Sequence, residues 1–215
     1  MSPPKLPPQI WFQSPSNVER LSILEETIPA AFVARALSAP RNIATADDFS
    51  GVVSYEKLLV GALLMARRFL RLPTTNIGLM LPASVASDIM LLALYLANKR
   101  PVRLNWTTGP ANLQHAVQLT GLTHVVTSRQ MRDRLAISIQ NVHYLDAEDL
   151  NKEFGWFQKL STLLLIRCLP NYVRRSVPQQ DPQADAVILF TTGFSQESRR
   201  KSILFLVGID SAFEL

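Results

Sequence analysis

The segment NIGLMLPASVASDIMLLALYLANKRPVRL, Asn76 to Leu104, decides the fold. Its apolar pattern predicts a strand over Asn76 to Leu81, which Pro82 ends, and then a helix that Ser84 can cap. A second strand is predicted over Pro101 to Leu104. A strand, a helix and a strand of these lengths are typical of a βαβ unit, whose two strands run parallel.

The same alternation of strands and helices continues on both sides of this segment. Strands separated by helices of this length predict an α/β protein with a doubly wound, mostly parallel sheet that has helices on both faces. The other expected elements are a helix from near Pro29, a hairpin of Ile43 to Ala46 with Val52 to Ser54, helices over Tyr55 to Leu70, Pro110 to Thr120 and Gln130 to Leu135, and strands over Thr123 to Thr127 and Val142 to Leu145.

The last predicted strand leads into a segment with phosphate-binding chemistry. AVILFTTGFSQESRRK, Ala186 to Lys201, places hydroxyl residues and glycine after a buried strand, and a cationic cluster follows. Hydroxyls and backbone N–H groups can surround phosphoryl oxygens at such a position, and Arg or Lys can neutralise their charge. A Thr-Thr-Gly sequence after a strand also occurs as an ordinary turn. Ligands of parallel sheets bind beyond the carboxyl ends of the strands, where this segment begins.

The composition excludes several classes of function. Of the 215 residues, 47% are hydrophobic and 18% charged, so the chain can form a large core. A net charge of +5 permits anionic partners, but the basic residues are scattered, which argues against a nucleic-acid surface. Cys168 is the single cysteine, and no Cys/His cluster has metal-ligand spacing, so no metal site is predicted.

No stretch reaches the roughly 18 uncharged apolar residues that span a bilayer, and the proline-rich leader of residues 1–17 has no signal-peptide core. We therefore expect a cytoplasmic protein. Trp156 to Leu169 predicts an apolar helix with basic residues in or beside it. Such a helix can lie on an anionic membrane, here the inner membrane, or pack on the core with a solvated charged edge; the second interpretation is the more common one.

The residue order resembles the N-terminal part of the adenylate-forming (AMP-binding) acyl synthetases. ILFTTG, Ile188 to Gly193, matches the first half of their ATP-binding signature, and residues 76–135 resemble two of their βαβ units. The most similar sequences are those of the synthetase half of bacterial acyl-acyl carrier protein synthetase/2-acylglycerophosphoethanolamine acyltransferase enzymes. This similarity rests on the segments LNWTTGPANL, SRQMRDRL and LDAEDL. The second half of the signature differs, because Phe194, Gln196, Ser198 and Arg199 replace the usual residues.

This resemblance implies an ATP-dependent ligase that activates a fatty acid as an acyl-adenylate with Mg²⁺ and transfers it to acyl carrier protein or coenzyme A. It implies that phosphate oxygens are held by Thr191, Thr192, Gly193 and Ser195, with Arg199 in the position of the family's lysine. Arg keeps the charge but not the shape of Lys. No catalytic residue is assigned.

The resemblance divides the chain into a leader at 1–17, an α/β subdomain at 18–201 and an apolar tail at 202–215. The family's adenine-binding segment, ribose-binding aspartate and catalytic lysine have no counterpart up to Leu215. We therefore expect a fragment that binds ATP weakly without a complete catalytic cycle, and a sheet whose edge is exposed at Phe190. The alternative is a non-catalytic remnant or a module that binds a membrane or a protein partner.

Overall fold

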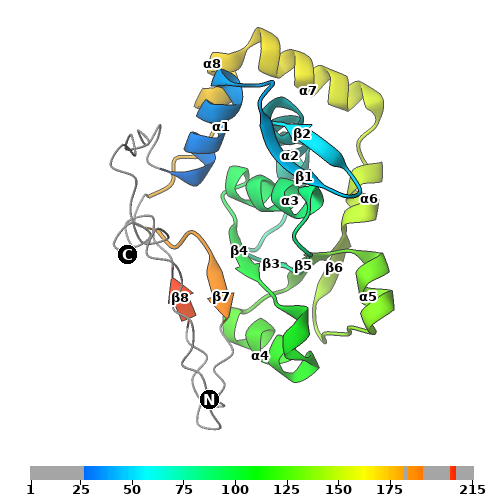
Figure 1. Ribbon diagram of the computed structural model, residues 1–215. Coiled ribbons are helices and arrows are strands. Elements are labelled where there is room, and N and C mark those ends of the chain that lie inside the picture. Colours follow the sequence, from blue (N-terminus) through cyan, green and yellow to red (C-terminus); the bar gives the residue numbers. More distant parts are fainter. Residues whose placement is uncertain (1–26, 182–183, 191–203, 207–215) are drawn as a thin grey trace, which may run out of the picture.

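The computed structural model describes residues 27–181, 184–190 and 204–206, and a central sheet organises them (Figure 1). Its strands lie in the order β6-β5-β3-β4-β7-β8. The first five of these are parallel to their neighbours, and β8 is antiparallel to β7. The bounds are β3 Asn76–Leu79, β4 Arg100–Arg103, β5 His124–Thr127, β6 His143–Asp146, β7 Ile188–Phe190 and β8 Leu204–Leu206.

Helices cover both faces of the sheet, as predicted. On the first face, Ile77, Leu79 and Val126 join the larger core, with α1 (Ile28–Ser38), α2 (Tyr55–Phe69), α3 (Val85–Leu96), α6 (Ala147–Lys152), α7 (Trp156–Cys168) and α8 (Pro170–Arg175). On the second face, Met80 and Val125 join a smaller core with α4 (Pro110–Thr120) and α5 (Arg129–Leu135). Consecutive strand residues point to opposite faces, so one apolar strand serves both cores.

Local signals in the sequence set the ends of these helices. The Ser84 hydroxyl accepts a hydrogen bond from the backbone N–H of Ser87 and caps α3. Gly121 closes α4 in the left-handed conformation, with φ 62°, which glycine adopts without steric cost. The predicted hairpin is present as β1 (Ile43–Asp47) and β2 (Gly51–Ser54), which pair antiparallel. The Ser84 cap and the hairpin confirm the predictions made for them.

Three features differ from the expectations. The short helices α6 and α8 were not predicted. The expected exposed edge at Phe190 is wrong, because β7 pairs with β4 on one side and with β8 on the other. The interpretation of α7 as a packed core helix holds for one face only, since Trp156 and Phe157 are 75% and 69% exposed. Among the described residues, no helix has the length and apolar character needed to cross a membrane.

Candidate functional site

The predicted phosphate-binding segment begins at the carboxyl edge of the sheet. In the parallel pairing of β4 with β7, Val102 lies opposite Ile188, and Arg103 lies opposite Leu189. The chain therefore leaves β7 after Phe190 beside the loop that follows β4. The predicted residues Thr191, Thr192, Gly193, Ser195 and Arg199 lie outside the described residues, so their roles stay predictions.

The loop after β4 is ordered by its own hydrogen bonds. The Asn105 side-chain oxygen accepts from the backbone N–H of Thr107 at 3.0 Å and from its hydroxyl at 2.8 Å. The Thr108 hydroxyl donates to the Asn105 carbonyl at 2.8 Å. Trp106 packs against the smaller core. These hydrogen bonds order the loop beside the end of β7.

The helices that follow β3, β4 and β5 differ at their N-termini. The first backbone N–H of α3, from Val85, donates to the Asp47 carboxylate at 2.8 Å. At α5, the N–H of Arg129 donates to the Glu148 carboxylate at 3.1 Å. Within residues 76–135, α4 differs from these two helices in having no side-chain cap at its N-terminus, where Gly109 precedes Pro110 with φ 86°. A helix N-terminus without a side-chain cap favours an anion, and that of α4 follows the loop after β4.

Arg103, the last residue of β4, is held at the same edge. Its guanidinium donates to the hydroxyl of Ser87, which is buried on α3, at 3.1 Å. The next helical turns of α3 carry Tyr95, whose burial raises its pKa to about 12 although the charge of Arg103 opposes the rise. Arg103 is thus a cation fixed on the α3 side of the sheet.

The β5–β6 end is occupied by an ion network that was not predicted. Asp146 is only 9% exposed and accepts three hydrogen bonds from the Arg132 guanidinium, which also stacks on Tyr144 at 4.3 Å from the ring centre. Arg129 pairs with both Asp146 and Asp149. The signal was the basic sequence SRQMRDRL followed by the acidic LDAEDL. Because these charged groups pair with one another, the β5–β6 end of the sheet has a structural role.

Glu148 completes the network by capping α5. Its carboxylate accepts from the Ser128 hydroxyl at 2.6 Å and from the backbone N–H groups of Arg129 and Gln130. Burial acts to raise the pKa of Glu148, but these hydrogen bonds outweigh it, and the pKa lies below its ordinary value. No group of three or more His, Cys, Asp or Glu side chains suited to a metal ion occurs in the part of the chain that the structure describes.

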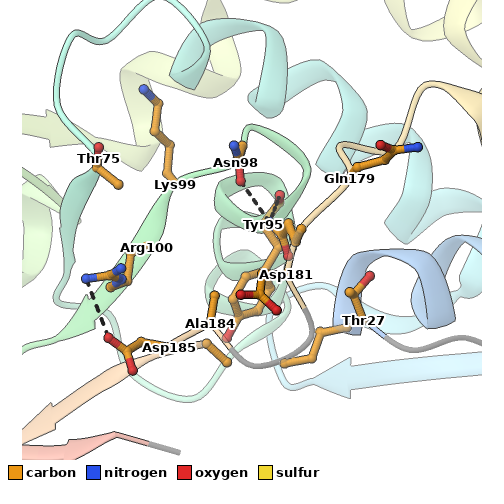
Figure 2. A pocket seen from close by; sticks show the side chains of 13 residues that line it. Thr27, Thr75, Tyr95, Asn98, Lys99, Arg100, Gln179, Asp181, Ala184 and Asp185 are labelled. Atoms are coloured by element: carbon orange, nitrogen blue, oxygen red, sulfur yellow. Dashed lines mark hydrogen bonds and ion pairs between the residues drawn. The ribbon is translucent and has the colours of Figure 1, made fainter. Parts of the chain in front are cut away.

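A cavity of about 220 Å³ lies at the opposite, amino edge of the sheet (Figure 2). Among the residues that line it, Arg100 pairs with Asp185 at 3.7 Å, and the Lys99 ammonium points away and donates to the Leu72 carbonyl at 2.7 Å. Its two cations are therefore held by other partners. The cavity was not predicted, and it is separate from the edge where Ile188 to Phe190 deliver the chain.

Two histidines lie together at the amino ends of neighbouring strands. His124 and His143 lie side by side on β5 and β6, with ring centres 5.5 Å apart. Burial lowers the pKa of His124, and His143 and Arg68 lower it further. A half-buried imidazole at the start of a strand suits a structural role better than that of a general base.

Solved structures with the same architecture were found, although no protein-family model matches the sequence. The nonribosomal peptide synthetase FmoA3 aligns with TM-score 0.59 and 14% identity over 77% of this chain and 16% of its own. The N-terminal subdomain of Klebsiella oxytoca NpsA gives 0.59 and 15% over 82% and 41%. VinN with 3-methylaspartate gives 0.60 and 15% over 78% and 45%.

This chain spans 16 to 45% of the length of those three chains. At such low identity the likeness establishes the fold alone. The chain has the fold of the N-terminal subdomain of adenylate-forming enzymes, in agreement with the architecture expected from its sequence.

Proposed function

We propose that this chain forms the phosphate-binding part of a site that activates a carboxylate with ATP. The observation that carries the proposal is the position of β7, which is parallel to β4 and ends at the carboxyl edge of the sheet. In the sequence, residues 191–199 follow directly after this strand. In the proposed reaction a carboxylate oxygen attacks the α-phosphorus of ATP. The bond to the β,γ-pyrophosphate breaks, and an acyl-adenylate and pyrophosphate form.

The structural neighbours support this chemistry for the fold. One form of FmoA3 has α-methyl-L-serine-AMP bound, and the NpsA N-terminal subdomain was solved with 3-hydroxybenzoyl-AMSN. Fold by itself does not decide function, so the local sequence has to supply the site. Thr191, Thr192 and Ser195 would offer hydroxyl groups to the phosphoryl oxygens, Gly193 would let the backbone approach them, and Arg199 would supply positive charge.

The described surroundings fit an anionic ligand at this edge. The N-terminus of α4 has no side-chain cap, and Arg103 places a fixed cation at the end of β4. By contrast, the carboxylates of Asp47 and Glu148 already occupy the N-termini of α3 and α5. Mg²⁺ would be held through the phosphate groups of ATP, and it would neutralise charge on the departing pyrophosphate.

We propose a fatty acid as the carboxylate and acyl carrier protein or coenzyme A as the acceptor, because the sequence of residues 104–150 most resembles the acyl-acyl carrier protein synthetases.

The second candidate is a non-catalytic module that binds a membrane or a protein partner. The exposed apolar residues Trp156 and Phe157 favour that candidate. The two functions use different surfaces, so separate variants can test them.

Calorimetry with ATP and Mg²⁺ tests the proposal, beside an assay for fatty-acid-dependent pyrophosphate release. We expect saturable binding that Thr192→Val and Arg199→Ala each weaken about tenfold, as expected when a charge-assisted contact is lost. Arg175→Ala is the matched control, since Arg175 is an exposed cation on α8. Binding without release would assign the chain the nucleotide-binding role alone. No binding, or equal weakening by the control, would overturn the proposal.

A further inference from the structure

Helix α7 presents an apolar surface that no described residue covers. Trp156, Phe157, Leu160 and Leu164 are 75%, 69%, 42% and 51% exposed, and we call these four side chains the α7 face. Their spacing of one, three and four residues places them within about 100° around the helix axis. The inner side of α7 is anchored instead by Thr162 and Ile166, which are buried.

The position of α7 makes this surface the outermost layer of its side of the molecule. The helix packs on α2 and α8, and Figure 1 shows it beyond α2, away from the sheet. Leu169 and Tyr172, at the turn into α8, are also exposed, at 54% and 61%. A groove of about 290 Å³ adjoins them, lined mainly by apolar side chains that include Leu63 and Leu165.

The sequence of α7 and α8 carries cations but no acidic residue. No Asp or Glu occurs between Glu153 and Asp181, whereas Lys159, Arg174 and Arg175 lie in this segment. Arg67 lines the groove from α2. Arg167 is committed elsewhere, because its guanidinium donates to both carboxylate oxygens of Glu56 at 2.8 and 2.9 Å. An exposed aromatic and aliphatic strip with a cationic border is complementary to anionic lipid headgroups over a hydrocarbon layer.

We propose that the α7 face is a docking surface for an anionic lipid bilayer, with Trp156 and Phe157 inserted at the headgroup level. A second copy of the chain suits the surface less well. The four side chains expose a few hundred Å², whereas a stable dimer buries about 800 Å² per partner, and the cationic borders of two copies would repel one another. This inference does not depend on the adenylation proposal.

Vesicle sedimentation of the purified full chain tests it, with vesicles of phosphatidylcholine alone and of phosphatidylcholine with 30% phosphatidylglycerol. We expect the protein to bind the anionic vesicles, and a blue shift of Trp156 fluorescence to accompany binding. The double variant Trp156→Ser/Phe157→Ser should bind at least tenfold more weakly. Lys159→Glu/Arg175→Glu should bind severalfold more weakly, and raised salt should produce the same loss in the wild type.

Matched controls come from the other face of the sheet, where Leu119 on α4 is 54% exposed and Arg134 on α5 is exposed. Leu119→Ser and Arg134→Glu should change vesicle binding by less than twofold. ATP calorimetry on the same variants separates this proposal from the previous one, because the α7 variants should bind ATP as the wild type does. Absence of vesicle binding, equal binding to both vesicle types, or a dimer that Trp156→Ser/Phe157→Ser dissociates would each overturn the proposal.

Discussion

The β5–β6 end and the β4–β7 end lie on the same edge of the sheet, but they are filled in different ways. At the first, Arg132 and Asp146 satisfy each other, and Glu148 occupies the N-terminus of α5. At the second, Asn105 orders its own loop, and the N-terminus of α4 has no side-chain cap. The difference indicates that parallel strand ends are available for a ligand only where the protein's own charges leave them open.

Asp146→Ala should cause the largest loss of stability and leave the ligand site intact. It removes a buried carboxylate and leaves Arg132 without its partner, which costs about 3 kcal/mol of unfolding free energy. Urea unfolding measures this loss. The exposed Asp149, which pairs with Arg129, provides the control, and Asp149→Ala should cost below about 1 kcal/mol. ATP affinity that falls together with stability would break the contrast between the two ends.

Gly78→Ala should cost about 2 kcal/mol by overpacking the sheet between the two ends. A methyl group at Gly78 would lie 2.9 Å from Val125 Cγ2, on β5, and 3.2 Å from Leu104 Cδ1, directly after β4. Gly61→Ala is the matched variant: its methyl group would meet Ile89 at 3.1 Å, but the gain in helix propensity offsets this contact. Thermal unfolding of both proteins measures the difference. Equal losses would show that β3 is not tightly packed between its neighbours.

Asn105→Ala should affect the ligand site more than Asp146→Ala does and the stability less. We expect a loss of about 1 kcal/mol of unfolding free energy and a severalfold weaker affinity for ATP. The substitution removes the oxygen that accepts hydrogen bonds from the Thr107 N–H and hydroxyl. The loop after β4, which lies beside the end of β7, then becomes less ordered. Calorimetry and urea unfolding give the two quantities. Asn171→Ala, at an exposed position on α8, should change neither. Unchanged ATP binding in Asn105→Ala would remove the β4 loop from the proposed site.

Glu148→Gln should reduce the pH dependence of stability by about 0.5 kcal/mol, a small figure because the carboxylate is partly solvated. The pKa of Glu148 is lower in the folded than in the unfolded chain, so the unfolded chain takes up the proton first as the pH falls. Its stabilisation is complete above the ordinary pKa of 4.5 and is lost below it. Urea unfolding between pH 3 and 6 measures this slope. An equal change in Glu153→Gln, at an exposed pair, would contradict the assignment.

The sequence predicted the elements whose signals are local. The apolar period and the capping residue Ser84 predicted α3, and the pattern of Pro110 to Thr120 predicted α4. Pairings between distant residues could not be predicted, because nothing local shows that Asp47 in the hairpin turn reaches the N–H of Val85. The same holds for Asp146 with Arg132, whose separation of 14 residues crosses from a strand to a helix.

The candidate site was predictable in part. An apolar run before Thr191 was enough to place the end of β7 at the carboxyl edge. The order of the sheet, with β7 beside β4 and beyond it β8, depends on crossovers that no local pattern contains. Similarly, the apolar composition of Trp156 to Leu169 predicted a helix there, but not that Trp156, Phe157 and Leu164 would be more than half exposed.

The pair between Arg167 and Glu56 joins residues 111 positions apart. A contact of such separation forms only after the intervening chain has been brought into place, because loop closure costs more entropy as the loop lengthens. Helix α7 should therefore dock late in folding, onto an α2–α3 layer that is already assembled. Substitutions at this pair should speed unfolding and leave the folding rate nearly unchanged.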